Sequence, residues 1–80
     1  MNDMSEILED YAHDHDIQFH YKGVEYFLVC CEPGYEYLQE GLNGNKELCR
    51  CENGKAMTDL SVAGVPLYDV LKEATIDYIY

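Results

Sequence analysis

The strongest constraint on the fold is the stretch IQFHYKGVEYFLVCC, in which apolar and polar side chains alternate on both sides of Lys22-Gly23. Alternation with a period of two is typical of a β-strand that buries one face. A two-residue turn at Lys22-Gly23 gives a hairpin in which directly paired residues share a face. The pairs expected on the apolar face, which also takes Cys30, are Tyr21 with Val24, Phe19 with Tyr26 and Ile17 with Leu28.

An amphipathic helix is predicted before the hairpin. Met4, Ile7, Leu8 and Tyr11 recur at helical spacing, and Asp3 stands where a helix N-cap is expected. The segments after the hairpin are a strand over 35–39, a loop over 40–46, an extended stretch over 48–51, a strand over 56–62, a helix from Pro66 to about Ala74 and a returning strand over 75–80. This order predicts one α+β domain over residues 1–80, with a small, mostly antiparallel sheet, an N-terminal helix and a short C-terminal helix.

The cysteines form two pairs, Cys30-Cys31 and Cys49-x-Cys51. Two thiolate pairs separated by a loop are the general plan of a structural zinc site, in which four sulfurs surround Zn²⁺ tetrahedrally. We therefore expect these four residues to bind a structural zinc ion that pins the loop 32–48 to the sheet. Because neighbouring strand residues face opposite sides, Cys30 and Cys31 can bind together only if the strand ends there.

Three alternatives to the four-thiolate site stay open. His20, which lies on the Cys31 face, could replace one cysteine. The cysteines could instead be buried free thiols, which behave as small hydrophobic residues. A disulfide from one pair to the other would also close the loop, in a secreted protein.

The charge of the chain is strongly negative, with sixteen acidic residues against five basic ones and a formal net charge of -11. Such a field repels nucleic acid and anionic membranes and attracts a basic surface. Acidity can also serve only to keep a small protein soluble. The acidic residues of the first sixteen positions, which include no Lys or Arg, are Asp3, Glu6, Glu9, Asp10, Asp14 and Asp16.

No sequence motif of an enzyme is present, whether GxSxG, P-loop, GxGxxG or HExxH, so we expect a protein without catalytic activity. The acidic N-terminal stretch lacks the basic and apolar regions of a signal peptide. No apolar run approaches the roughly 20 residues that span a bilayer. The expected compartment is therefore the cytoplasm, and the expected form is a monomer.

A protein-binding role remains, and eight tyrosines fit it because tyrosine is enriched at interfaces. Carboxylates spaced along a helix can imitate the phosphates of a nucleic acid, so the natural partner is a basic groove of a nucleic-acid enzyme. The alternative is a small structural or regulatory subunit that binds through its sheet. The residues expected to contact the partner are Glu6, Glu9, Asp10, Asp14, Asp16, Tyr35, Glu36, Tyr37 and Glu40.

In size, acidity, α+β pattern and cysteine content the whole chain resembles the small acidic anti-CRISPR proteins of phages that inhibit Cas9 in type II systems, a group with a zinc-bearing member. The resemblance lies in overall character and not in a motif, so it transfers no residue roles. It implies a phage protein in the cytoplasm of a bacterial host. It further implies binding to a basic lobe of Cas9 and interference with guide or target DNA loading.

Overall fold

The predicted hairpin forms the centre of the fold. The computed structural model describes residues 1–31, 34–41 and 46–80. Strands β1 (Ile17–Tyr21) and β2 (Val24–Cys31) pair antiparallel in the predicted register. At the turn, Lys22 and Gly23 have φ angles of 51° and 80°. Positive φ at both central residues is the mark of a type I′ turn, whose twist matches that of the strands, and the hairpin prediction is confirmed.

Three further strands complete an antiparallel sheet around this hairpin. They are β3 (Tyr35–Glu40), β4 (Glu47–Glu52) and β7 (Thr75–Ile79), and the strand order is β4-β3-β2-β1-β7. The final strand of the chain therefore pairs with β1, and β4 and β7 are the two edges. Strand β4 is longer than the short extended stretch that the sequence predicts.

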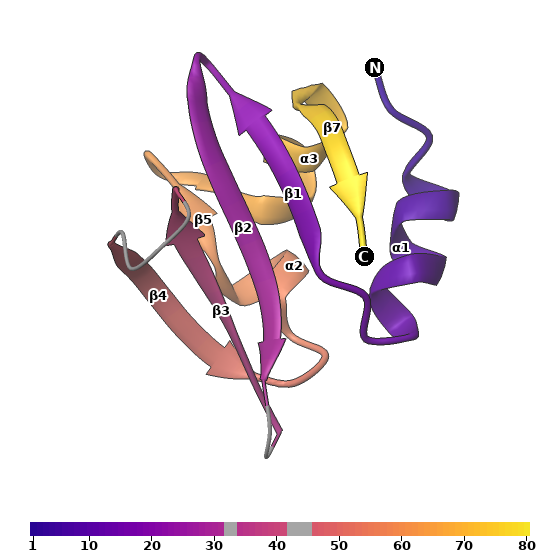
Figure 1. Ribbon diagram of the computed structural model, residues 1–80, viewed down its shortest axis with the longest axis vertical. Helices are drawn as coiled ribbons and strands as arrows, with labels where there is room; N and C mark the ends of the chain where they lie inside the picture. The colour runs from indigo at the N-terminus through magenta and orange to yellow at the C-terminus, as the bar shows by residue number, and fades with distance from the viewer. Residues whose placement is uncertain (32–33, 42–45) are drawn as a thin grey trace.

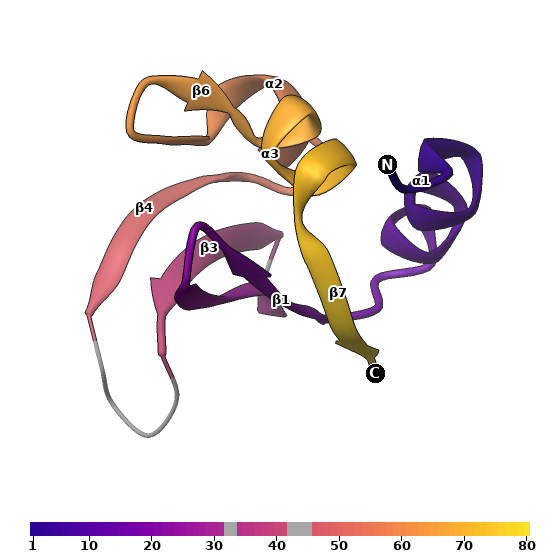
Figure 2. The ribbon, with the colours of Figure 1, turned by 90° about the horizontal axis from the view of Figure 1, so that it is seen from above.

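The helices lie on one side of the sheet and at one edge. They are α1 (Met4–Ala12), α2 (Ala56–Asp59) and α3 (Leu67–Glu73), and β5 (Ser61–Val62) and β6 (Val65–Pro66) form a small hairpin between the last two. Figures 1 and 2 show α2 and α3 on one face of the sheet and α1 beside β7. The opposite face carries no helix among the described residues. The chain is thus an α+β fold, as predicted.

The core fills the space between the sheet and the helices. Its fully buried side chains include Ile17, Phe19 and Leu28 of the sheet and Leu67 and Leu71 of α3. The apolar face predicted for the hairpin is therefore the face that meets the helices. Burial of side chains of this size contributes about 1.5–3 kcal/mol each relative to exposure.

Residues 56–62, predicted as a strand, form α2 and the short strand β5 instead. Ala56, Met57 and Leu60 are all buried. A strand would turn Ala56 and Met57 to opposite faces, whereas one helical turn buries both together with Leu60. The strand prediction is wrong here because the segment packs on the sheet and does not join it.

The N-terminal residues tie α1 to α3. Asn2 donates its backbone N–H to Lys72 O at 2.9 Å, and its side-chain amide donates to Leu71 O at 2.8 Å and Ala74 O at 2.6 Å. These carbonyls belong to the last turn of α3 and its end, where no intrahelical donor is left for them. Asn2 therefore serves as a cap for α3 and fixes the start of α1 against it.

Both ends of α1 have recognisable caps. Asp3 accepts a hydrogen bond from the Ser5 N–H at 3.0 Å, which confirms the predicted N-cap. At the other end Asp14 N–H bonds to Tyr11 O and His15 N–H to Asp10 O, both within 3.2 Å. This pair of bonds is a Schellman motif, in which the residue after the cap adopts a left-handed conformation. Asp14 does so with a φ of 61°.

Replacing Asp14 with glycine is expected to stabilise the protein. Glycine adopts the left-handed conformation without the strain that a side chain brings, and the change also removes a negative charge from the negative end of the helix dipole. We expect a gain of at most about 1 kcal/mol in the free energy of unfolding, because Asp tolerates this conformation better than most residues. Thermal unfolding measures it.

The control for this substitution is Ala12→Gly, which places glycine at the last helical residue, where the backbone is still right-handed. It is expected to cost about 0.5–1 kcal/mol, because glycine there only adds entropy to the unfolded chain. An Asp14→Gly variant that is no more stable than the original protein would contradict the assignment of Asp14 as the helix-terminating residue.

Candidate protein-binding site

The buried centre of the candidate site is the carboxyl group of Glu36, a residue that is 0% exposed. Glu36 lies in β3 on the core face, between Cys30 of β2 and Cys51 of β4. Its Oε1 accepts hydrogen bonds from the Tyr11 hydroxyl at 2.7 Å and the Gly54 N–H at 2.6 Å, and the Cys30 thiol donates to Oε2 at 3.6 Å. A buried carboxyl group is costly without such donors, so these three contacts are what make its position in the core tolerable.

Tyr11 connects two helices to this carboxyl group. Its side chain reaches from α1 into the core, where the hydroxyl donates to Glu36 and accepts the N–H of Ala56 at 3.0 Å. Burial raises the pKa of Tyr11 well above its ordinary value, and the hydrogen bond to Glu36 raises it further. The Tyr11 hydroxyl therefore stays protonated and holds α1 and the start of α2 to strand β3.

The sequence prediction that Glu36 contacts a partner is wrong, because its side chain points into the core. The signal that could have shown this is its place in β3. Glu36 shares the strand face of Leu38, and Leu38 pairs with the buried Leu28 of the hairpin. An acidic residue on the face of a core leucine indicates a buried carboxyl group.

The four cysteines divide between the two faces of the sheet. Cys30, Cys49 and Cys51 lie on the core face, where Cys30 and Cys51 flank Glu36 and Cys49 pairs with Leu38. Strand β2 continues through Cys31, which pairs with Tyr35 and so faces the other way. Burial and the nearby carboxyl group of Glu36 raise the pKa of Cys30 to about 12 and that of Cys51 to about 11.

This arrangement does not bring the predicted zinc ligands together. Strand β2 ends at Cys31, as predicted, but both cysteines still pair in regular register with β3, so their side chains face opposite sides of the sheet. Within residues 1–31, 34–41 and 46–80, no three His, Cys, Asp or Glu side chains converge on a point that could hold a metal. All four cysteines are free thiols in this structure. The zinc site stays a prediction.

The predicted acidic contacts of α1 differ in their exposure. Glu6 and Glu9 are exposed, as is Asp14 just past the helix, and Asp10 is half-buried. Asp16 is also half-buried, and its Oδ1 accepts the backbone N–H of Cys30 at 2.9 Å. The structure thus leaves Glu6, Glu9 and Asp14 as the acidic surface of α1, and it gives Asp16 a structural role that the sequence did not reveal.

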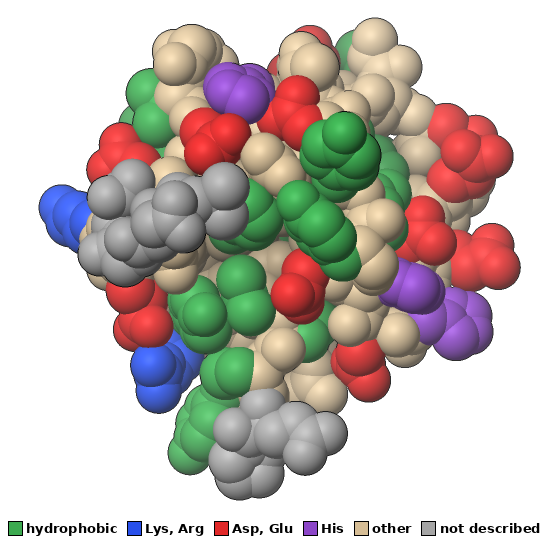
Figure 3. All heavy atoms as spheres, in the orientation of Figure 1, with side chains coloured by type: hydrophobic (Ala, Val, Ile, Leu, Met, Phe, Trp, Pro, Cys, Tyr) green, Lys and Arg blue, Asp and Glu red, His purple; other side chains and the backbone are tan. Residues whose placement is uncertain are grey.

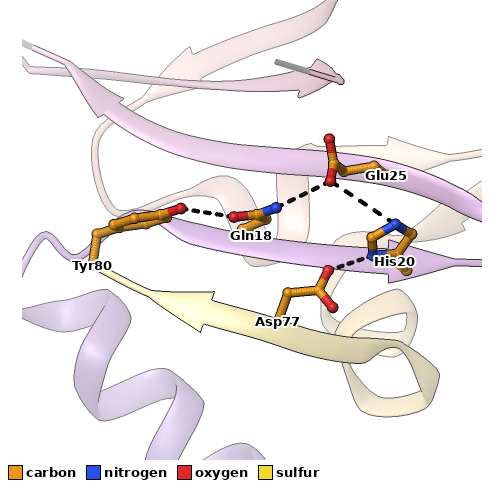
Figure 4. A network of polar contacts seen from close by, with 5 residues as sticks. All are labelled: Gln18, His20, Glu25, Asp77 and Tyr80. Atoms are coloured by element: carbon orange, nitrogen blue, oxygen red, sulfur yellow. Dashed lines mark hydrogen bonds and ion pairs between the residues drawn. The ribbon is translucent and has the colours of Figure 1, made fainter.

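A chain of polar contacts crosses β2, β1 and β7 on the face of the sheet away from α2 and α3 (Figure 4). We call this face the open face. The Tyr80 hydroxyl donates to Gln18 Oε1 at 2.7 Å, and the Gln18 amide donates to Glu25 at 3.0 Å. His20 lies between Glu25 and Asp77 and donates from Nδ1 to the Asp77 carboxylate. The network fixes the C-terminal strand to the hairpin.

The open face is rich in tyrosine. Tyr35, Tyr78 and Tyr80 are 45%, 64% and 59% exposed, and Tyr37 is half-buried. The Arg50 guanidinium lies 5.9 Å from the ring centroids of both Tyr35 and Tyr37. Figure 3 shows hydrophobic side chains gathered along the middle of this face with acidic ones around them. The predicted contacts Tyr35 and Tyr37 are therefore on an accessible surface.

Glu40, the remaining predicted contact, ends β3 and is half-buried. It lies on the strand face of Glu36 and Leu38, and its backbone N–H bonds to Lys46 O at 2.7 Å. The predicted contacts therefore do not form one surface. The acids of α1 lie beyond the β7 edge of the sheet, and the tyrosines of β3 lie on the open face.

The chain matches no protein-family model, and no curated protein or solved structure is significantly similar to it. In the part of the chain that the structure describes, no helix is long and apolar enough to cross a membrane. The resemblance to anti-CRISPR proteins therefore stays a hypothesis.

The raised pKa values of Cys30 and Cys51 predict that stability falls at alkaline pH. In the unfolded chain a thiol loses its proton near pH 9.0, whereas the folded protein keeps these protons until about pH 12 and about pH 11. The stability that they contribute is full below pH 9 and is lost as the pH rises through the folded values. We expect the Cys30→Ser/Cys51→Ser variant to lose stability less steeply above pH 9 than the original protein, measured by denaturant unfolding.

A zinc site gives the opposite expectation for the same experiment. Thiolates bound to Zn²⁺ are already deprotonated, so the original protein would not lose stability through this window. A chelator would then lower its melting temperature, and native mass spectrometry would detect one zinc ion. Equal slopes for the two proteins would contradict the thiol assignment.

Proposed function

We propose that this chain is an acidic, non-enzymatic inhibitor that binds a basic groove of a nucleic-acid enzyme and occupies the place of its nucleic acid. Cas9 is the partner that the resemblance to anti-CRISPR proteins favours, through a block of guide or target DNA loading. The single observation that carries the proposal is the surface of α1. It exposes Glu6, Glu9 and Asp14 in a stretch without Lys or Arg.

The position of α1 supports this role. The helix lies at the β7 edge of the fold (Figure 2), so a partner can reach it without contacting the body of the sheet. Its inner side is anchored by Tyr11 at one end and Asn2 at the other. A rigid row of carboxylates costs little ordering entropy on binding, and it accelerates encounter with a basic partner in a salt-dependent way.

The net charge argues against nucleic acid and anionic membranes as direct partners. A chain with a formal net charge of -11 is repelled by phosphate backbones and by anionic lipid. The proposal therefore includes neither nucleic acid nor membrane as a direct ligand, and it assigns a monomer. The structural zinc predicted at the cysteines is a separate hypothesis that this function does not require.

A second candidate function is that of a structural or regulatory subunit that binds through the open face of the sheet. The exposure of Tyr35, Tyr78 and Tyr80 favours it. Tyrosine supplies large, rigid contact area at low entropy cost. Such a contact would be mainly apolar and would resist salt.

Charge reversal on α1 distinguishes the two candidates. We expect Glu6→Lys/Glu9→Lys to weaken binding to Cas9 by at least about tenfold and to reduce its salt dependence, because the contact is electrostatic. Asp10 and Asp14 are left unchanged, since Asp10 is half-buried and Asp14 holds a left-handed conformation. Binding is measured by surface plasmon resonance at low and high salt.

The matched control is Asp69→Lys/Glu73→Lys, which changes the net charge equally on exposed residues of α3. It is expected to bind nearly as well as the original protein. Equal losses in the two variants would show that only the overall charge matters. Binding that survives both reversals and high salt would favour the open face, and no binding at all would overturn Cas9 as the partner.

A further inference from the structure

A groove runs between α1 and the edge strand β7. Its volume is 190 Å³, which is below the roughly 300–1,000 Å³ of a typical small-molecule pocket. Ile7 of α1 and Ile76 and Ile79 of β7 form its apolar part. Strand β7 pairs only with β1, so the groove lies along a sheet edge with no strand neighbour in the described part of the chain.

The groove is apolar on one side and acidic on the other. Asp3, Glu6 and Asp10 line it from α1, where their spacing of three and four residues places them in one row. Asp3 uses Oδ1 to cap the helix, and among residues 1–31, 34–41 and 46–80 none of these three carboxylates forms an ion pair. No Lys or Arg is among the lining residues.

One kind of occupant matches both sides. Lys and Arg side chains combine an apolar stem with a cationic end, and they cover apolar surface with the stem while the charge stays in a polar setting. In this groove the stem would lie over Ile76 and Ile79, and the cation would meet the carboxylates of Glu6 and Asp10. The volume suits one such side chain and not a folded segment.

We propose that the groove between α1 and β7 is the specificity pocket of the interface and takes a single arginine or lysine side chain of the basic partner. This inference rests on the proposed function, and it places one contact with the partner in the groove. It separates the roles of the α1 acids: Glu9 attracts the partner from the outer surface, whereas Glu6 and Asp10 hold one of its cations. The apolar stem adds a contact that salt does not screen.

The four isoleucines of the chain make this testable by methyl NMR. Ile7, Ile76 and Ile79 line the groove, and Ile17 is fully buried in the core. The probe is the peptide acetyl-Gly-Arg-Gly-amide, with the citrulline analogue as an uncharged control of the same shape. We expect saturable shifts of the three groove methyl signals with the arginine peptide, much smaller shifts with citrulline, and little change at Ile17.

Neutral substitutions identify the carboxylates that bind. Glu6→Gln/Asp10→Asn is expected to raise the dissociation constant of the arginine peptide by at least about tenfold, since both charge partners are lost. Asp69→Asn/Glu73→Gln removes the same charge from α3 and is expected to leave that constant unchanged. Equal binding of the citrulline and arginine peptides, or shifts that do not include Ile76 and Ile79, would overturn the pocket.

The two proposals can fail separately. If the arginine peptide does not bind in the groove but Glu6→Lys/Glu9→Lys still abolishes Cas9 binding, the pocket is wrong and the acidic interface stands. If the peptide binds and Cas9 does not, the pocket stands and the identity of the partner is wrong.

Discussion

The hydrogen bond between the Tyr11 hydroxyl and the buried carboxyl group of Glu36 is the contact on which the arrangement of this fold depends. It joins α1 to the inner strand β3 of the five-stranded sheet, and the same hydroxyl accepts the first N–H of α2. Glu36 also binds the Gly54 N–H just before α2. One polar cluster therefore holds two helices in position. Both hydrogen bonds of the Tyr11 hydroxyl are buried, where an unmade bond is costly.

The candidate functional features follow from where this cluster holds α1. With Tyr11 fixed inside, the opposite side of the helix turns Glu9 outward. The row of Asp3, Glu6 and Asp10 then faces the edge of β7 and encloses the groove. The acidic side chains of α1 are thus held in a defined position. The apolar side chains of β7 form the other wall of the groove.

Local patterns in the sequence predicted much of the fold, because local physics determines those parts. The alternation around Lys22-Gly23 fixed the hairpin register, and Asp3 marked the start of α1. The strand prediction over residues 56–62 was wrong because the burial of this segment depends on packing against the sheet. The role of Glu36 was missed because its donors come from Tyr11 and Gly54, distant in the chain, and the groove was missed because its two walls are more than sixty residues apart.

The most direct test of this central contact is a double-mutant cycle with Tyr11→Phe, Glu36→Met and their combination, in which urea unfolding gives the free energy of each protein. We predict that each single substitution is destabilising and that the two are coupled by about 1–3 kcal/mol, because either one breaks the same buried hydrogen bond. If the losses of the two single variants sum to the loss of the double variant within about 0.5 kcal/mol, the two residues are independent. That result would contradict the central role of this hydrogen bond.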